Sequence, residues 1–440
     1  MATQLPDNRG EVVFEDFKPA YTDAQAVTEA NRCLYCLDAP CIDACPTGID
    51  IPTFIRKIAT GNVRGAAKTI FDSNIFGMSC ARVCPVEVLC VGDCVYNRFD
   101  ESPPIQIGKL QRYATDIAYA KGEQFYEAGP DTGKRVAVVG GGPAGLACAH
   151  RLRRFGHAVT IFEKRDVLGG LNTTGVAPYK MRADKSLEEV DWVLAIGGIE
   201  VKTGVDVGAS PSLGELLADY DAVFVGIGLG PDSPLVVDGE TLDGVMGAVD
   251  FIEEMKLQPS RFGGVRHAVV VGGGNTAIDA VREALGLGIP EVTMLYRGTE
   301  GGMPGYAHEW KAAKVEGARA LWQRQPVGFE GADGKVTGIR CVRLDDRKQP
   351  VADSEHVVHA DLVLIAIGQS RLLDQVAALE GVRADGRRIV ADEAGFTGHP
   401  GLYVGGDLKN GAKEVVNAVA EGRDAAVAID AHLSTSGQGA

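Results

Sequence analysis

The apolar residues of this chain fall into short unbroken runs separated by stretches of helical periodicity. Residues 136–139 form one such run, and a glycine turn and an amphipathic stretch separate it from a second run at residues 158–162. Runs of four or five apolar residues predict strands buried on both faces, and the periodic stretch between them predicts a helix. The same order recurs at residues 268–296. We therefore expect an α/β protein with two Rossmann-like dinucleotide-binding domains.

The turn after the first predicted strand has the spacing of a dinucleotide-binding loop. Gly140, Gly142 and Gly145 form GxGxxG: the first permits a tight turn, the second lets a pyrophosphate approach the backbone, and the third lets helix and strand pack closely. The second strand ends at Glu163, whose carboxylate can accept hydrogen bonds from a ribose diol. Glycine turns alone are common, but the whole strand–turn–helix–strand order favours a cofactor site lined by Gly140, Gly142, Pro143, Ala144, Gly145 and Glu163.

A second turn of this kind follows the strand at residues 268–271. Gly272, Gly274 and Ala277 form GxGxxA, and alanine at the third position still permits close packing. The next strand ends at Arg297, where an NAD-specific site would favour an acid. A guanidinium there can bind a 2′-phosphate or stack on adenine, or it can be an ordinary surface residue. NADPH is thus slightly favoured over NADH at a site lined by Gly272, Gly274, Asn275, Thr276, Ala277 and Arg297.

Further glycine-rich segments occur in the order of a flavin-binding fold. Gly169 and Gly170 suit a loop against a flat ligand, and Lys180 can meet a phosphate. Two apolar strands, at residues 220–228 and 361–368, bracket the second nucleotide unit and are expected to return to the first fold. After a last strand at residues 402–404, a helix from about residue 414 can point its N-terminus at a flavin. Each segment alone could be a plain loop; together they add Gly170, Leu171, Lys180, Gly228, Gly368, Gly406, Asp407, Val415 and Val416 to the predicted site.

Eight of the ten cysteines lie between Cys33 and Cys94, in the arrays CxxCxxxxCxxxCP and CxxxCPxxxxCxxxC. In a reducing compartment such crowding indicates metal or cluster ligation rather than disulfides. Structural zinc sites usually pair two short CxxC knuckles across a longer loop, whereas these arrays are asymmetric and carry Cys-Pro, as in two-cluster ferredoxins. Two iron–sulfur clusters are therefore favoured over two zinc ions, and spacing alone would use all eight cysteines.

Charge and composition narrow the possible partners. The net charge of −15 argues against a polyanion as principal partner. No apolar run approaches the length of a membrane span, and residues 1–20 are too acidic and polar for a signal peptide, so we expect a cytoplasmic protein. The polar segment 121–135 predicts a linker. The expected organisation is a helical iron–sulfur domain at residues 1–130, an FAD domain at 131–247 and 370–440, and an NAD(P)H domain inserted at 248–369.

Together these motifs resemble the glutamate-synthase small-subunit family of two-cluster flavoproteins, and more narrowly its dihydropyrimidine dehydrogenase branch. The resemblance covers essentially the whole chain and rests on RCLYCLDAPCIDACP, CARVCPVEVLC, IGKLQRYATD, VVGGGPAGLACA, VVGGGNTAIDA, MPGYAHEW and VGGDLKNGAKEVVNAVAEG. It implies two [4Fe-4S] clusters, FAD and NAD(P)H. In the pyrimidine branch one ligand is a glutamine, which corresponds here to Gln111, and Cys80 stays unligated. The implied ligand sets are Cys33, Cys36, Cys41 and Cys94 for one cluster and Cys45, Cys84, Cys90 and Gln111 for the other.

The resulting hypothesis is an electron-input flavoprotein that oxidises NAD(P)H and passes electrons through FAD and the clusters to a catalytic partner subunit. A partner that reduces uracil and thymine is favoured, and glutamate synthase or another iron–sulfur oxidoreductase is the alternative. A thioredoxin-reductase-like enzyme would need a redox CxxC near the flavin, but beyond Cys94 only Cys148 and Cys341 remain. A non-enzymatic assembly module is a further alternative, which rapid bleaching of FAD by NADH or NADPH would dismiss. No side-chain acid or base is required for hydride transfer, so no catalytic residue is assigned.

Overall fold

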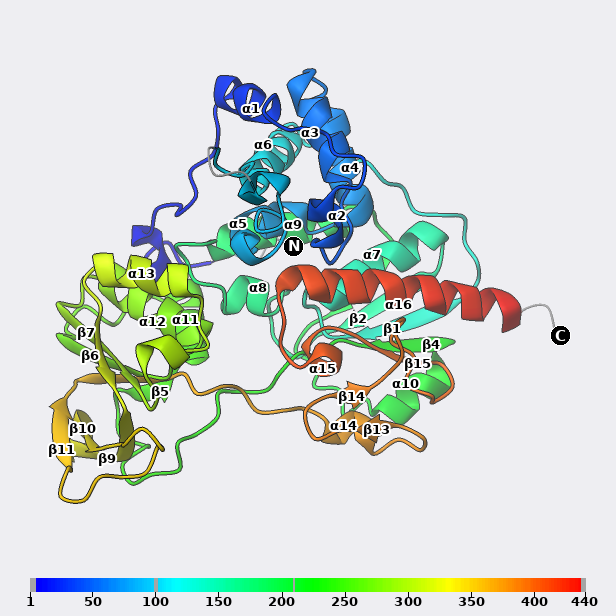
Figure 1. Ribbon diagram of the computed structural model, residues 1–440. Helices are drawn as coiled ribbons and strands as arrows, with labels where there is room; N and C mark the ends of the chain where they lie inside the picture. Colours follow the sequence, from blue (N-terminus) through cyan, green and yellow to red (C-terminus); the bar gives the residue numbers. More distant parts are fainter. Residues whose placement is uncertain (1–4, 99–101, 209, 437–440) are drawn as a thin grey trace.

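The computed structural model describes residues 5–98, 102–208 and 210–436. These residues form three structural parts (Figure 1). A helical cysteine domain, formed by helices α1 to α6, lies above two α/β parts. The first nucleotide domain contains the sheet of β1 to β4 and β15, and the inserted domain contains β5 to β12. The C-terminal helix α16 (Val415–Ser436) lies between the cysteine domain and the first sheet, in contact with both.

Side-chain caps begin helices α1 and α3 of the cysteine domain. Thr22 and Gln25 form a reciprocal capping box at α1, and Asp50 accepts a hydrogen bond from the Thr53 N–H at α3, with Pro52 in the first turn. The helices are α1 (Asp23–Ala30), α2 (Pro40–Asp43), α3 (Ile51–Ala59), α4 (Val63–Ser73), α5 (Gly77–Val83) and α6 (Ile107–Ala120), with short 3-10 turns at Gly10–Val13, Val86–Val88 and Val95–Arg98.

The first nucleotide domain is built on a five-stranded parallel sheet in the order β15-β4-β1-β2-β3. Every β1 residue after the first is buried, as expected of a strand covered on both faces. Its strands are β1 (Arg135–Val139), β2 (Ala158–Phe162), β3 (Ile199–Lys202), β4 (Ala222–Val225) and β15 (Leu402–Val404), beside a small pair, β13 (Arg383–Ala384) and β14 (Ile389–Val390). Its other helices are α7 (Pro143–Phe155), α8 (Leu171–Thr174), α9 (Ala183–Leu194), α10 (Leu213–Asp219), α14 (Asp374–Ala377) and α15 (Asp407–Asn410).

The inserted domain repeats this plan with a parallel sheet in the order β5-β12-β6-β7-β8 and adds an antiparallel sheet in the order β11-β10-β9. The parallel strands are β5 (Val245–Gly247), β6 (His267–Val271), β7 (Glu291–Tyr296), β8 (Arg319–Trp322) and β12 (Leu362–Ile365). The antiparallel strands are β9 (Arg324–Ala332), β10 (Lys335–Arg343) and β11 (His356–His359). The helices are α11 (Ala248–Leu257), α12 (Asn275–Gly286) and α13 (Ala307–Val315), with a 3-10 turn at Glu300–Gly302.

One strand does not lie where the sequence suggested. We expected residues 361–368 to return to the first fold, but β12 pairs with β5 and β6 in the inserted sheet, so that expectation is wrong. A strand buried on both faces fits either parallel sheet equally well, and its pattern does not say which. Because β5 belongs to the same sheet, that sheet begins at Val245, three residues before the expected boundary at 248.

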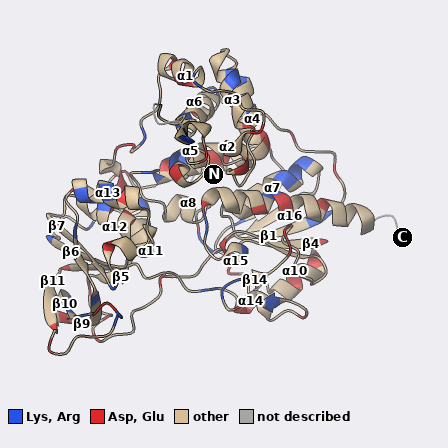
Figure 2. Cartoon of the chain, viewed as in Figure 1, with Lys and Arg blue, Asp and Glu red and all other residues tan. Residues whose placement is uncertain are grey.

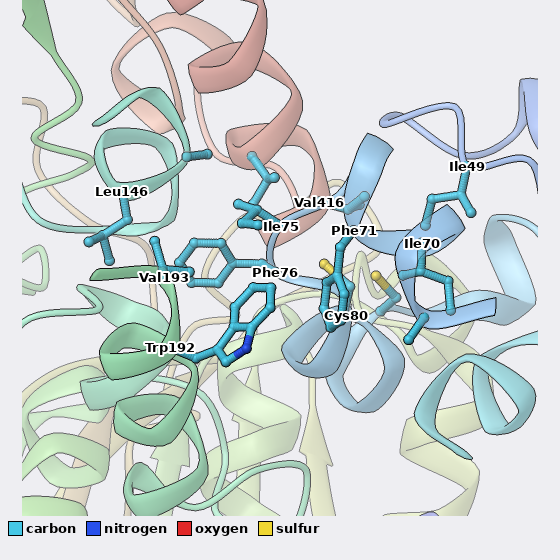
Figure 3. Packing of buried hydrophobic residues seen from close by; sticks show 14 of the residues in the cluster. Ile49, Ile70, Phe71, Ile75, Phe76, Cys80, Leu146, Trp192, Val193 and Val416 are labelled. Carbon is cyan, nitrogen blue, oxygen red and sulfur yellow. The ribbon is translucent and has the colours of Figure 1, made fainter. Parts of the chain in front are cut away.

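A single hydrophobic core joins the cysteine domain to the first nucleotide domain. Figure 3 shows Phe71 and Phe76 of the cysteine domain beside Leu146, Trp192 and Val193 of the nucleotide domain. The Phe71 and Trp192 ring centroids are 4.6 Å apart. Because the two domains share one core, their relative position is fixed by packing.

Basic and acidic residues are distributed along all three parts of the chain (Figure 2). Among the described residues, none of the helices has the length and apolar character required to cross a bilayer.

Candidate redox site

Four cysteines line one pocket of the cysteine domain. Cys33, Cys36, Cys41 and Cys94 surround it together with apolar residues that include Ile51, Ile55, Ile105 and Ile107. Burial and the neighbouring thiols raise the pKa of Cys41 to about 12, and burial likewise raises the pKa of Cys33. Four thiolates are thus disfavoured here without a cation, and an iron–sulfur core would supply the compensating positive charge. The donor set therefore fits a cluster. We refer to these cysteines as the outer group.

A second set of cysteines, the inner group, contains Cys45, Cys84 and Cys90. A hydrogen bond with Cys80, and then burial, raise the pKa of Cys84 well above its usual value, and burial and the Cys45 thiol raise that of Cys90. Cys45 Sγ lies 3.3 Å from Thr47 Oγ1. In the described part of the chain no three His, Cys, Asp or Glu side chains form a site for a single metal ion.

Gln111, the predicted fourth ligand of the inner group, lies on α6 with 7% of its surface exposed. Its Nε2 donates a hydrogen bond to the Gly77 carbonyl, at 2.8 Å, on the first residue of α5. This bond fixes the amide through its nitrogen, and the amide oxygen is the atom that can ligate iron. Cys80 lies on α5, is also buried, and its thiol is in hydrogen-bond contact with that of Cys84, whereas Gln111 reaches α5 at the Gly77 carbonyl.

In the two glycine turns, some glycines are required by close packing of the protein and others are not. A Cβ at Gly145 would lie 1.9 Å from the Gly140 carbonyl oxygen, and one at Gly272 would lie 2.2 Å from that of Ala366. A Cβ at Gly142 would meet nothing closer than 3.8 Å, and at Gly274 it would meet nothing within 4 Å. Both residues have extended backbone, with φ of −81° and −86°, which any residue can adopt. The open space in front of the second glycine of each turn therefore fits a dinucleotide.

Around the first turn, three loops converge on Gly142 and Ala144. Gly170 has φ +53°, and a Cβ there would lie 3.0 Å from Gly142 Cα. Gly406 has φ +67°, and its Cβ would lie 3.2 Å from that of Ala144. The Glu163 carboxylate accepts hydrogen bonds from the backbone N–H groups of Gly141, at 2.7 Å, and Arg165, at 2.8 Å. The predicted residues of the first site that come from distant segments are thus brought together.

Other predicted residues take positions that the sequence could not specify. Lys180 bridges the two nucleotide domains, because its Nζ lies 2.9 Å from Asp279 and 2.8 Å from Glu309, and it is therefore already paired with carboxylates. Asp407 accepts a hydrogen bond from the Lys413 N–H, and burial raises its pKa. The remaining positions are simple: Leu171 begins α8, Val415 and Val416 begin α16, and Gly228 and Gly368 have positive φ on the connections between domains.

In the second turn, α12 begins at Asn275, whose Oδ1 accepts a hydrogen bond from the Tyr306 N–H at 2.9 Å. Thr276 and Ala277 continue the helix, with Ala277 fully buried, and Arg297 follows β7 with an exposed side chain. The Tyr306 hydroxyl donates to Glu414 of the first nucleotide domain at 2.9 Å. This contact was not predicted from the sequence, although MPGYAHEW was among the motifs of the family resemblance and the helix near residue 414 was part of the predicted flavin site.

Comparison with known proteins identifies the family. Residues 10–123 match the family described as dihydropyrimidine dehydrogenase domain II, 4Fe-4S cluster, and residues 134–422 match pyridine nucleotide-disulphide oxidoreductase. The glutamate synthase [NADPH] small chain of Escherichia coli K12 is 36% identical over 95% of this chain and 93% of its own length. The NAD-dependent dihydropyrimidine dehydrogenase subunit PreT of the same organism is 35% identical over 95% of this chain and 97% of its own. The chain belongs to the pyridine nucleotide-disulphide oxidoreductase family and has an N-terminal 4Fe-4S domain of the dihydropyrimidine dehydrogenase type.

Membership confirms several predictions made from the sequence. The chain is an NAD(P)H-dependent oxidoreductase, and its cofactors are FAD, [4Fe-4S] clusters and NAD(P)H. The predicted fold class, a helical iron–sulfur domain followed by Rossmann-type nucleotide domains, is also confirmed.

Solved structures resemble the nucleotide domains in fold. Mycobacterium tuberculosis FprA in complex with NADPH aligns with a TM-score of 0.55 at 20% identity, over 70% of this chain and 86% of its own. Thioredoxin reductase of T. acidophilum aligns with a TM-score of 0.54 at 22% identity, over 68% of this chain and 98% of its own. At this identity the likeness concerns the fold alone.

Proposed function

We propose that this chain is the electron-input subunit of a heteromeric oxidoreductase. NAD(P)H binds at the Gly272–Gly274 turn of the inserted domain, FAD binds at the Gly140–Gly145 turn, and electrons leave through the inner and then the outer cysteine group. The observation that carries the proposal is spatial: α5, the helix that precedes Cys84 of the inner group, packs on α9 and α16 of the first nucleotide domain.

The residues of the chain have positioning roles in this scheme. A bound flavin supplies the conversion of a two-electron hydride into single electrons. The open backbone at Gly142 and Gly274 admits the two pyrophosphates, and the N-termini of α7 and α12 stabilise their charge. Glu163 would accept hydrogen bonds from a ribose diol, and the N-terminus of α16, at Val415 and Val416, would stabilise negative charge on the flavin. Cys33, Cys36, Cys41 and Cys94 hold one cluster, and Cys45, Cys84, Cys90 and Gln111 hold the other.

We favour a partner that reduces uracil and thymine to dihydropyrimidines. Gln111 supports this choice, since it occupies the position at which the pyrimidine branch carries a glutamine. The alignment with relatives named as dihydropyrimidine dehydrogenase subunits covers 97% of the length of those relatives. Relatives named as glutamate synthase small chains match equally well, so glutamate synthase remains the second candidate.

Co-purification from the native host, followed by assays of the complex, tests both levels of the proposal. We expect NADH or NADPH to bleach the flavin rapidly under anaerobic conditions, and uracil to accelerate NAD(P)H oxidation by the complex. Bleaching without any response to uracil, together with glutamate formation from 2-oxoglutarate and glutamine, would replace the pyrimidine assignment with the second candidate. A protein that holds flavin and clusters but is not reduced by either nucleotide would refute the electron-input role.

A further inference from the structure

A carboxylate is buried between the first nucleotide domain and the cysteine domain. Glu189, on α9, is fully buried and accepts hydrogen bonds from two backbone N–H groups at the start of α5, those of Met78 at 3.0 Å and Ser79 at 3.1 Å. The Ser79 hydroxyl donates a further hydrogen bond to Glu189 Oε2. Charged side chains are rarely fully buried unless they are paired, so this position calls for an explanation.

One peptide unit connects this carboxylate to the inner group. The Gly77 carbonyl accepts the hydrogen bond from Gln111 Nε2 at 2.8 Å, and the N–H of the same peptide, on Met78, donates to Glu189 Oε1. A peptide is a planar, conjugated group, so a negative charge at its N–H end makes its carbonyl a stronger acceptor. The amide of Gln111 is polarised in turn, which places more negative charge on the oxygen available to iron.

On its other side Glu189 is linked to the loop that converges on the first glycine turn. Asn172 Nδ2 donates to the Ser79 hydroxyl at 2.9 Å and approaches Ser186 Oγ at 3.1 Å. Asn172 follows Gly170 by two residues and is itself buried. A continuous series of hydrogen bonds therefore runs from the predicted flavin loop through Ser79, Glu189 and one peptide to Gln111.

We infer that Glu189 is a positioning residue that holds Gln111 through the Gly77–Met78 peptide and tunes the reduction potential of the cluster bound by the inner group. The inference rests on the proposed function and on Gln111 as a ligand. A carboxylate at this point opposes addition of an electron to the cluster and lowers its potential. Glu189 would take up one proton from solvent for the one electron that a cluster bound by the inner group gains, so that the two charges offset each other.

The surroundings of Glu189 set the pH range of this coupling. Burial raises the pKa of Glu189 to about 7, while the hydrogen bonds from Ser79 and Met78 and the charge of Arg82 oppose that rise. Arg82 is shared with Asp116 at 2.8 Å, and Tyr119 of α6 also faces Glu189, with its own pKa raised by burial and by Glu189. From α8, Asn172 and Thr173 contribute no titrating group. Proton uptake on reduction predicts a potential that falls as the pH rises through about 7.

The test is a redox titration of the loaded protein, followed by electron paramagnetic resonance, at pH 6 and pH 8. For wild type we expect the equilibrium constant for reduction of the inner cluster to fall by up to tenfold per pH unit as the pH rises. This change corresponds to 59 mV in the reduction potential for one electron. In Glu189→Gln the potential should be higher at pH 8 and nearly independent of pH. Glu188→Gln is the matched control, because Glu188 is the neighbouring residue on α9 but is 40% exposed and paired with Lys185. It should behave as wild type.

Further variants separate the possible failures. An unchanged pH dependence in Glu189→Gln, with an altered inner-cluster spectrum in Gln111→Ala, would overturn the inference. If both variants match wild type while NAD(P)H still reduces the clusters, the ligand assignment and the inference fall and the electron-input role stands. If Glu189→Gln does not retain its clusters, Ser79→Ala decides. Loss of that hydroxyl should raise the pH at which the potential changes, and an unmoved pH profile would refute the inference.

Discussion

At Gly142 and Gly274 the absence of a side chain is not required by the fold, and it leaves room for a ligand. Gly142 and Gly274 have ordinary extended backbone and open space where a side chain would project. We expect Gly142→Ala and Gly274→Ala to fold with a loss of stability of about 1 kcal/mol, because glycine is preferred to alanine at a helix N-cap but neither new Cβ meets a clash. Gly142→Ala should retain less than half of its flavin. Gly274→Ala should keep its flavin, but the KM for NAD(P)H should rise about tenfold, equivalent to about 1.4 kcal/mol.

Gly145→Ala is the contrasting control at the residue scale. Its Cβ would lie 1.9 Å from the Gly140 carbonyl oxygen, so strand and helix would have to separate and stability itself should fall by roughly 1–3 kcal/mol. Thermal melts, flavin absorbance and steady-state kinetics of the three variants provide the comparison. Normal flavin content in Gly142→Ala and normal KM in Gly274→Ala would mean that the nucleotides do not approach these turns.

At the scale of single helices, α5 and α6 each carry one candidate for the eighth cluster ligand, Cys80 and Gln111. Cys80 lies within α5, four residues before Cys84, which caps the end of this helix, and Gln111 reaches the first residue of α5 from α6. We expect Cys80→Ala to retain wild-type iron and sulfide content and wild-type cluster spectra. Gln111→Ala should change the spectrum of one cluster, because a neutral oxygen ligand is lost. Loss of iron only in the Cys80 variant would reverse the assignment.

Elements defined by local sequence were predictable, and contacts between elements were not. The strand–turn–helix units depend on residues close in the chain, and they appear where expected. The sheet that receives β12 depends on tertiary pairing, which an apolar pattern does not encode. The burial of Glu189 could not be predicted for a related reason. A charged residue in an amphipathic helix is expected to be exposed to solvent, and Glu189 is buried because the cysteine domain packs over α9.

The arrangement of the whole molecule depends on a junction near the N-terminus. Arg9 and Glu11, both buried, form an ion pair at 2.9 Å, and Glu11 accepts a hydrogen bond from the Ala183 N–H of the first nucleotide domain. From the inserted domain, Lys256 donates to the carbonyls of Val176, at 2.8 Å, and Met181. Burial lowers the pKa of Lys256 to about 8, and the charge of Glu11 opposes that fall. The N-terminal segment thus contributes the charge that lets a buried lysine connect the two nucleotide domains.

Neutralising Glu11 should therefore uncouple the inserted domain. In Glu11→Gln, Lys256 and Arg9 lose a buried counter-charge, and breaking such a buried pair typically costs about 3–5 kcal/mol. We expect calorimetry of the loaded protein to resolve an early transition for the inserted domain. NAD(P)H should also bleach the flavin more slowly, because the nicotinamide is no longer held against it in one orientation. Asp7→Asn removes the same charge from an exposed residue of the same segment and should leave both measurements unchanged. A single, unshifted transition in Glu11→Gln would mean that packing alone, through contacts such as Gly10 against Met255, holds the inserted domain in place.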